Sequence, residues 1–193
     1  MNSPLNELKI WLEDERTMGN IFSLGAVLST VSKEGIPRSR VVGTMLDEEN
    51  IPRFHTSPTS RKYEDICNNN AASLTYSFQG TLRSISIEGY ISPLDKEELE
   101  NDWLTFDENF RKHYLIFGEC SGTEIGSLDD LREKRDSLSS EMENIRPDSF
   151  VGFKFTDIRR VSFYSVKELD FAISILYERD SSNKVWLKRS IAP

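Results

Sequence analysis

Residues 21–46 read IFSLGAVLSTVSKEGIPRSRVVGTML, and this stretch has the pattern of two strands joined by a turn. Its first part, from Ile21 to about Ser32, is rich in residues that favour β-strands. The segment Lys33-Glu34-Gly35 is typical of a tight turn. Arg38 to Leu46 alternates polar with apolar side chains in its first half, as a half-buried strand does. The stretch therefore predicts a β-hairpin.

The segments on either side of this hairpin predict more strands, flanked by helices. We expect helices from Ser3-Pro4 through Leu12, from residues 57–60 through Ile66, over about Asp95–Phe106 and from Ser127 to about Asn144. We expect strands at Ile51–Thr56, Ala71–Phe78, Leu82–Ile91, Phe150–Phe155, Arg159–Ser165, Phe171–Glu178 and Lys184–Ser190. Strands and helices come in blocks with no regular βαβ alternation, which predicts an α+β protein built on an antiparallel β-barrel.

The charged segment at 95–144 is typical of an inserted or peripheral element. Its second helix carries an apolar stripe of Leu128, Leu131, Leu138 and Met142, which favours packing against the core over a groove for a partner. No internal repeat, low-complexity tract or interdomain linker interrupts the 193 residues. We therefore expect one domain over residues 1–193.

Charge and composition argue against several classes of function. The formal net charge is -8 and the pI is near 4.9, so a broad surface for nucleic acid or anionic membrane is not expected. The first twenty residues lack the basic start and apolar run of a secretion signal. No stretch approaches the roughly 18 apolar residues of a membrane span. We expect a cytoplasmic protein with neither nucleic acid nor membrane as partner.

The cysteines and histidines predict no metal site. Cys67 and Cys120 lie far apart and have no partner at CxxC spacing, so two reduced thiols are expected. His55 and His113 are the only histidines, and neither belongs to a ligand motif such as HExxH. With no recognisable triad, dyad or metal-ligand set, the sequence assigns no catalytic residue.

Basic residues gather at two places in this acidic chain. Arg38 and Arg40 alternate along one expected strand and so share a face. Ser60-Arg61-Lys62 stands where a short helix begins, and free backbone N–H groups, a hydroxyl, a guanidinium and an ammonium together suit a phosphate dianion. The alternative is that the arginines are surface charges paired with nearby acids, each exposed pair contributing only about 0–1 kcal/mol, and that Ser60 is a routine cap.

The order and spacing of several short motifs resemble the pyridoxamine 5'-phosphate oxidase family from about Leu8 to the last residue. The motifs are Arg38-Ser39-Arg40-Val41-Val42, Phe54-His55-Thr56-Ser57, Ser60-Arg61-Lys62, Ser84-Ile85-Ser86-Ile87-Glu88-Gly89, Val161-Ser162-Phe163-Tyr164, and Trp186 with the ending Arg189-Ser190-Ile191-Ala192-Pro193. The resemblance implies a homodimeric, antiparallel split β-barrel with peripheral helices. It also implies two sites for flavin mononucleotide (FMN) at the dimer interface.

The same resemblance implies which residues would bind the flavin. Two adjoining strands and the following helix start supply Arg40, Val41, Val42, His55, Thr56, Ser60, Arg61 and Lys62. Of these, Arg61 and Lys62 would hold the flavin phosphate, which agrees with the charge pattern. Ser84 and Tyr164 stand where the family has a glutamine and a tryptophan near the flavin ring, and they keep a polar group and an aromatic ring.

The chain departs from the family at the positions that would hold pyridoxamine phosphate. Met45 replaces a lysine that contacts substrate, and Leu169–Ser174 lacks the family's Arg-Leu-His segment. Asn109–His113 stands roughly in place of the family's Arg-Pro-Arg and Ser-Gln segment. Within it, Arg111 and Lys112 are either replacement anion contacts or ordinary surface charges.

These observations predict an FMN-binding oxidoreductase that acts on an unidentified small molecule. Flavin chemistry belongs mainly to the cofactor, so the lack of a protein nucleophile or metal ligand set does not argue against an enzyme. One alternative is a non-catalytic barrel that binds flavin, another phosphate ligand or haem, or a barrel kept for structure alone. A further alternative is true pyridoxamine phosphate oxidase activity with a reorganised pocket.

Overall fold

The computed structural model describes residues 3–20, 24–138, 144–180 and 185–193. In these ranges eight strands form one antiparallel sheet in the order β3-β2-β1-β4-β5-β6-β7-β8, and an additional β3–β6 pairing closes the first six into a barrel. The strands are β1 (Gly25–Val31), β2 (Pro37–Leu46), β3 (Pro52–Thr56), β4 (Ala71–Phe78), β5 (Arg83–Pro93), β6 (Val151–Ser165), β7 (Ile173–Arg179) and β8 (Trp186–Ile191). The helices are α1 (Pro4–Thr17), α2 (Arg61–Asn68), α3 (Lys96–Thr105), α4 (Glu108–Phe117) and α5 (Leu128–Asp136).

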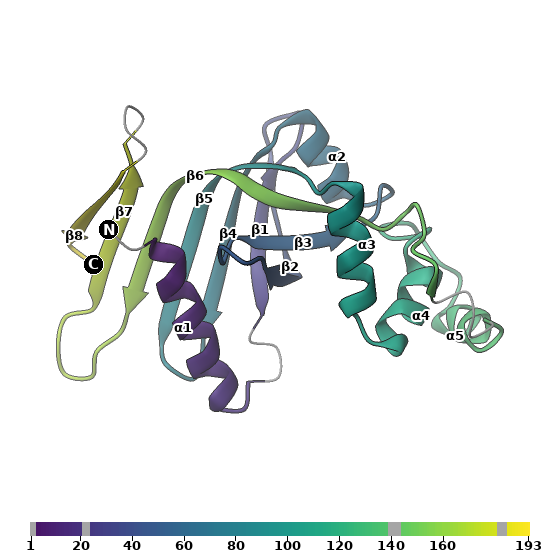
Figure 1. Ribbon diagram of the computed structural model, residues 1–193, viewed down its shortest axis with the longest axis horizontal. Helices are drawn as coiled ribbons and strands as arrows, with labels where there is room; N and C mark the ends of the chain where they lie inside the picture. The colour runs from purple at the N-terminus through teal and green to yellow at the C-terminus, as the bar shows by residue number, and fades with distance from the viewer. Residues whose placement is uncertain (1–2, 21–23, 139–143, 181–184) are drawn as a thin grey trace.

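The main core fills the barrel and the face of α1 that lies on it. Ser3 caps α1 and Pro4 takes its first position, as the sequence predicts. Leu5, Leu8 and Leu12 are buried against inward-facing strand residues such as Leu28, Leu74, Ile85, Ile87 and Val161. Figure 1 shows α1 lying across the strands of the sheet, with β7 and β8 beyond β6. The expected α+β split barrel with peripheral helices is confirmed.

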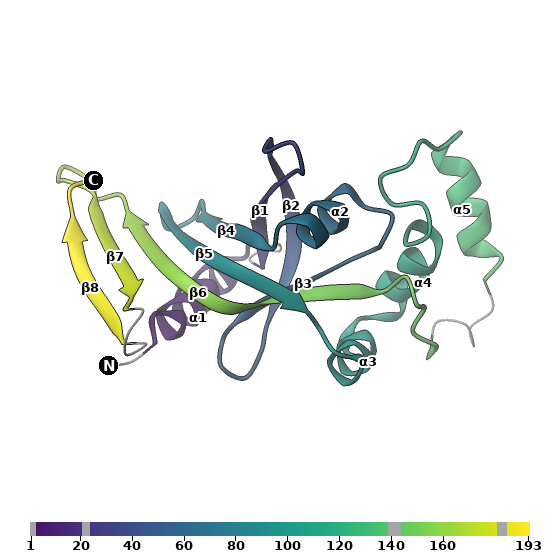
Figure 2. The ribbon, with the colours of Figure 1, turned by 90° about the horizontal axis from the view of Figure 1, so that it is seen from above.

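A second, smaller core joins α3 and α4 to the start of β6. Leu94, Leu99, Trp103, Tyr114 and Phe150 are buried there. Figures 1 and 2 show α3, α4 and α5 gathered at the end of the molecule opposite β7 and β8. Because β3 pairs with the first residues of β6, this helical end is fixed beside β3 and α2. None of the described helices has the length and apolar character needed to cross a bilayer.

The two strands expected at Phe150–Phe155 and Arg159–Ser165 are one continuous strand, β6. Its pairing with β5 shifts register between Glu88 and Gly89 and again between Tyr90 and Ile91. A Cβ on Gly89 would lie 2.2 Å from the Asp157 carbonyl oxygen, so only glycine fits at the first shift. The shifts let one long strand bend from β5 towards β3 without breaking, and the sequence pattern alone separated its two halves.

Three further expectations differ from the structure. Helix α4 was not expected, and β7 begins at Ile173, where its pairing with Ser165 of β6 starts, rather than at Phe171. Helix α5 ends at Asp136, before Leu138, and it buries no side chain. Leu128 is 61% exposed, so the prediction that the apolar stripe packs in the core is wrong for it. Parts of the expected elements at residues 21–23, 139–143 and 181–184 lie outside the described residues.

Candidate functional site

Four cationic side chains line one cleft at the start of α2. The cleft has a volume of about 380 Å³ and is lined by Arg38, Ser39, Arg40, Ser60, Arg61, Lys62, Ser121 and Gly122. Ser60 is the N-cap of α2, and its hydroxyl accepts a hydrogen bond from the Tyr63 backbone N–H. The backbone N–H groups of the first helical turn therefore point towards the cleft, where an anion is favoured. The structure thus brings the two predicted basic groups together.

Arg38 and Arg40 are fixed by one buried carboxylate, Asp65. Asp65 is 1% exposed and accepts hydrogen bonds from Arg38 Nη1 at 2.8 Å and from Thr30 Oγ1 at 2.7 Å. Arg40 Nη2 lies 3.4 Å from the same carboxylate, and its Nη1 donates to Thr30 Oγ1. Both sequence interpretations of the arginines therefore hold in part: they pair with an acid and they also line the cleft. Four cations face one carboxylate, so the cleft keeps a positive excess.

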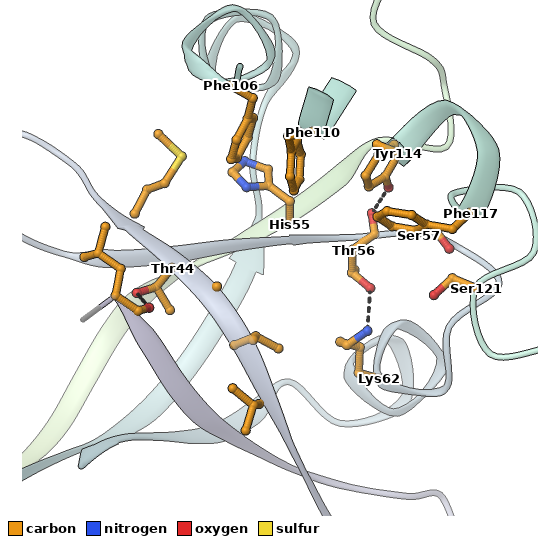
Figure 3. A pocket seen from close by; sticks show the side chains of 15 residues that line it. Thr44, His55, Thr56, Ser57, Lys62, Phe106, Phe110, Tyr114, Phe117 and Ser121 are labelled. Carbon is orange, nitrogen blue, oxygen red and sulfur yellow. Dashed lines mark hydrogen bonds between the residues drawn. The ribbon is translucent and has the colours of Figure 1, made fainter. Parts of the chain in front are cut away.

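Lys62 lies between this cleft and a larger cavity. Its Nζ donates a hydrogen bond to Thr56 Oγ1 at 3.1 Å (Figure 3). Thr56 Oγ1 also lies 2.7 Å from Ser60 Oγ. Burial lowers the pKa of Lys62, and repulsion from Arg40 lowers it further. The residues described give Lys62 no acidic partner. An anion in the cleft would supply the negatively charged partner that this ammonium lacks.

The larger cavity has a volume of about 570 Å³ and walls that are mainly apolar. Strands β2 and β3, helices α2 and α4 and the adjoining loops line it with Leu24, Val41, Val42, Gly43, Thr44, Met45, His55, Thr56, Ser57, Lys62, Phe106, Phe110, Tyr114, Phe117 and Ser121. Lys62 and Ser121 line both spaces. The basic cleft and the apolar cavity are therefore adjoining parts of one site.

The wall supplied by α4 is a row of aromatic side chains. Phe110, Tyr114 and Phe117 recur at helical spacing, and Phe106 stacks on Phe110 with ring centroids 4.1 Å apart. The Tyr114 hydroxyl donates to the Thr56 carbonyl at 2.6 Å and lies 2.8 Å from that of Ser149. Burial raises the pKa of Tyr114 above its ordinary value, so this phenol stays protonated as a donor. Figure 3 shows these rings facing the β2 and β3 side of the cavity.

His55 belongs to a buried charged group at the cavity wall. Its Nε2 lies 2.8 Å from Asp102 Oδ2, and Arg53 Nη2 lies 2.6 Å from the other carboxylate oxygen. The imidazole stacks on Phe150 with centroids 4.6 Å apart, and its side chain is 5% exposed. Asp102 engages the ring through Nε2, so Nδ1 is the ring nitrogen that this carboxylate does not contact. Among the described residues Nδ1 has no hydrogen-bond partner.

Two of the ten predicted flavin residues lie away from this site within one chain. Ser84 and Tyr164 face each other across the β5–β6 pairing, and neither lines the cleft or the cavity. They alternate with the buried Ile85 and Phe163, so they lie on the outer face of the barrel. The other eight all line the cleft or the cavity.

The two basic residues on α4, Arg111 and Lys112, line neither space. Lys112 forms an ion pair with Glu108 on the same helix. The Nε of Arg111 is buried without a hydrogen-bond partner in the described part of the chain. In this arrangement neither side chain replaces the lost substrate contacts.

Sequence reasoning missed the aromatic wall, Asp65, Asp102 and the loop at Ser121. The aromatic wall had a signal, since Phe110, Tyr114 and Phe117 have the spacing of one helix face behind the N-cap Asp107. Asp65 and Asp102 had none, because their partners lie more than twenty residues away in the chain. Within the described residues, no group of three His, Cys, Asp or Glu side chains could hold a metal ion.

The closed barrel defines a split-barrel protein. Its basic cleft opens into an apolar cavity, and this arrangement suits an elongated ligand that is anionic at one end. The family model described as pyridoxamine 5'-phosphate oxidase matches residues 24–119. This chain is a member of the pyridoxamine 5'-phosphate oxidase-like family.

Curated relatives span nearly the whole chain. The pyridoxine/pyridoxamine 5'-phosphate oxidase of Leptospira biflexa is 25% identical over 193 residues, covering 98% of this chain and 89% of the relative. The dihydrophenazinedicarboxylate synthase of Burkholderia lata is also 25% identical over 193 residues, covering 100% and 89%. The chain is therefore equally similar to two relatives whose names describe different activities.

Solved structures share the fold. PhzG from Burkholderia lata, in complex with tetrahydrophenazine-1-carboxylic acid, aligns with a TM-score of 0.87 and 22% identity over 100% of this chain and 94% of that one. A pyridoxamine 5'-phosphate oxidase-related, FMN-binding protein from Nostoc punctiforme aligns with a TM-score of 0.80 and 17% identity over 97% and 96%. At these identities the likeness establishes the architecture.

Proposed function

We propose that this protein binds FMN and acts as an FMN-dependent oxidoreductase on a small, planar and largely apolar molecule. The observation that carries the proposal is the continuity between the basic cleft and the apolar cavity, which share Lys62 and Ser121. FMN also has one charged and one largely apolar end, because it carries a phosphate dianion at one end and a flat ring system at the other. Its family and the FMN-binding protein that shares its fold support the same cofactor.

The residues present suit each part of this cofactor. Arg61, Lys62 and the N-terminus of α2 would hold the phosphate, with Arg40 fixed nearby by Asp65. Val41 and Val42 on β2 and Thr56 on β3 would lie along the flavin. When bound, FMN supplies the redox chemistry by accepting a hydride equivalent from the substrate.

The cavity wall contributed by α4 indicates the kind of substrate. Phe106, Phe110, Phe117 and Met45 offer flat or flexible apolar surface and no positive charge to a phosphate. A substrate without a phosphate group fits this wall better than pyridoxamine phosphate does. The complex of Burkholderia lata PhzG with a partly reduced fused-ring acid supports a ring-shaped substrate.

The chain's own side chains would orient the substrate and exclude water. The aromatic rings of α4 displace water from the substrate side of the cavity. His55, held by Asp102 through Nε2, would present Nδ1 to a polar group of the substrate. Arg53 keeps the Asp102 carboxylate in place from its other side.

A homodimer is part of the proposal. Ser84 and Tyr164 lie on the outer face of the barrel, away from their own chain's cavity. In a dimer that joins these outer faces, they would approach the flavin of the second copy. Sedimentation equilibrium of the purified protein should give twice the chain mass of 22.2 kDa, and a monomer at all concentrations would contradict this part.

The visible absorbance spectrum after addition of FMN and desalting tests the proposed function. Flavin bands should remain with the protein. After reduction, the bound flavin should be reoxidised by oxygen or an added acceptor, and no pyridoxal phosphate should form from pyridoxamine phosphate. A colourless protein would overturn cofactor binding, whereas bound flavin that never cycles would leave only a non-catalytic flavin-binding module.

A further inference from the structure

A second cavity lies on the opposite side of the sheet from Ser84 and Tyr164, between α1 and the strands β6 to β8. It has a volume of about 420 Å³ and is lined by Glu7, Trp11, Arg83, Phe163, Ser165, Lys167, Ile173, Ile175, Tyr177 and Lys188. It shares no residue with the cleft or the cavity of the proposed flavin site. Figure 1 shows α1 crossing the sheet here, with β7 and β8 continuing past β6.

Aromatic rings form one part of this cavity. Trp11 meets Phe163 edge to face with centroids 5.2 Å apart, and Phe163 meets Tyr177 in the same way at 5.6 Å. The Trp11 indole N–H is already satisfied, because it donates to Glu7 Oε1 at 2.7 Å. Rings held in this way offer flat apolar surface, which suits a planar ligand.

Three cations face the same space in a chain whose net charge is -8. Arg83 is paired with Asp14 at 2.9 Å and lies over the Trp11 ring, 4.9 Å from its centroid. Lys188 Nζ lies 5.6 Å from the Tyr177 ring centroid. In the part of the chain that the structure describes, neither Lys167 nor Lys188 has an acidic partner. Among the described residues that line the cavity, Glu7 is the only acid, and its carboxylate accepts a hydrogen bond from the Trp11 indole N–H.

We propose that this cavity is a second ligand site, which binds a planar aromatic carboxylate. The ring would lie against Trp11 and Tyr177, and the carboxylate would accept hydrogen bonds from Lys167 and Lys188. A volume near 420 Å³ suits one ring or two fused rings and is too small for a peptide or a lipid chain pair. The site does not depend on flavin binding, since it lies on another face of the sheet.

A titration with 2-naphthoate, followed by the indole N–H signals in ¹⁵N–¹H correlation spectra, tests the proposal. The chain has three tryptophans, and a Trp11→Phe variant identifies the signal of Trp11. Naphthoate should shift the Trp11 signal saturably, with or without excess FMN. The signal of Trp103, which is fully buried in the other core, should stay in place and serves as a check on folding.

Charge is tested with a neutral analogue and matched lysine variants. The Lys167→Met/Lys188→Met double variant should bind naphthoate at least about tenfold more weakly, because it loses two charge-assisted contacts. A Lys33→Met control, on the exposed β1–β2 turn, should bind as the parent does. 2-Naphthalenemethanol should bind more weakly than naphthoate. An unmoved Trp11 signal, equal binding of the neutral analogue, or full affinity in a folded double variant would each overturn the proposal.

Discussion

Asp65 shows how one residue converts two surface arginines into part of a site. It receives hydrogen bonds or ion pairs from Thr30, Arg38 and Arg40, which lie 25 to 35 residues earlier in the chain. The alternation of the two arginines predicts their common face, but no local pattern predicts a partner on α2. The arginines were therefore predictable as a charged pair, and their fixed geometry was not.

Asp65→Asn should destabilise the free protein. The variant leaves two guanidinium groups, 21% and 31% exposed, without their carboxylate. We expect a loss of about 2–3 kcal/mol in the free energy of unfolding, below the range for fully buried pairs because water reaches both arginines. Urea unfolding measures the loss, with Asp136→Asn on the exposed α5 as the control.

Inorganic phosphate should restore part of that stability. At matched ionic strength it should raise the unfolding midpoint of Asp65→Asn by more than that of the parent, because the cleft has gained a positive charge. An equal response to phosphate and chloride would contradict an anion site at this position.

We expect Lys62 to lower the stability of the free protein and to strengthen its binding of FMN. Its folded-state pKa lies below the ordinary value, so the charged form carries a cost at neutral pH that is relieved as pH rises from the folded-state pKa towards 10.5. Lys62→Met should therefore leave the free protein at least as stable as the parent at neutral pH. It should weaken FMN binding by about 10- to 100-fold, the equivalent of roughly 1.5–3 kcal/mol.

Fluorescence titration of FMN and urea unfolding check the two halves of this prediction. Lys33→Met serves as the control because Lys33 is exposed on the β1–β2 turn. A variant of Lys62 that keeps parental FMN affinity would place the phosphate elsewhere.

At the scale of elements, α4 joins the site to the second core. Tyr114 connects this helix to the carbonyl groups of Thr56 on β3 and Ser149 before β6. Tyr114→Phe should lower the free energy of unfolding by about 1–3 kcal/mol, because the two carbonyl oxygens lose the one hydroxyl that they share. Urea unfolding of the free protein tests this, with Tyr90→Phe, whose ring is 43% exposed, as the control. Equal losses in the two variants would count against a clamping role for Tyr114.

Glu15 fixes the end of α1 to the turn between β4 and β5. Burial raises its pKa, but hydrogen bonds from Thr81, Asn20 and the Gly80 backbone outweigh burial and bring the pKa below the ordinary 4.5. The ionised Glu15 therefore stabilises the folded protein fully above pH 4.5. This contribution is lost as the pH falls through the lower pKa that Glu15 has in the folded state.

Glu15→Gln should cost about 1–3 kcal/mol near neutral pH and show a flatter decline of stability in acid. Urea unfolding between neutral pH and about pH 3 measures both effects. Glu13→Gln, exposed on the same helix, is the matched control. If the free energy of unfolding fell equally steeply in acid for the parent and for Glu15→Gln, the role assigned to Glu15 would be contradicted.

The outcome for the helices shows where the sequence pattern succeeds and where it fails. Strong caps at Ser3, Ser60 and Asp95 mark α1, α2 and α3 within a residue or two. Helix α5 has a similar cap but contacts mainly α4, and its own stripe residues Leu128 and Leu131 are not buried. Periodicity records which face is apolar and does not record whether anything covers it.

At the scale of the whole molecule, pairing between β3 and β6 closes the barrel. The pairing joins residues 53–56 with residues 151–154, nearly a hundred positions apart. Alternation in each segment predicts strands, but strand order and the bend of β6 depend on pairings that no local pattern contains. The order of the family motifs along the chain implied a split barrel, but it gave neither the strand order nor the bend of β6.

In the proposed complex, the basic cleft recognises the phosphate of a flavin whose ring occupies the adjoining cavity. Comparing the affinities of FMN and riboflavin, by quenching of flavin fluorescence, tests this recognition most directly. The two ligands differ only in the phosphate, so FMN should bind about 100-fold more tightly or better. Equal affinities, or no binding of either flavin, would contradict the account.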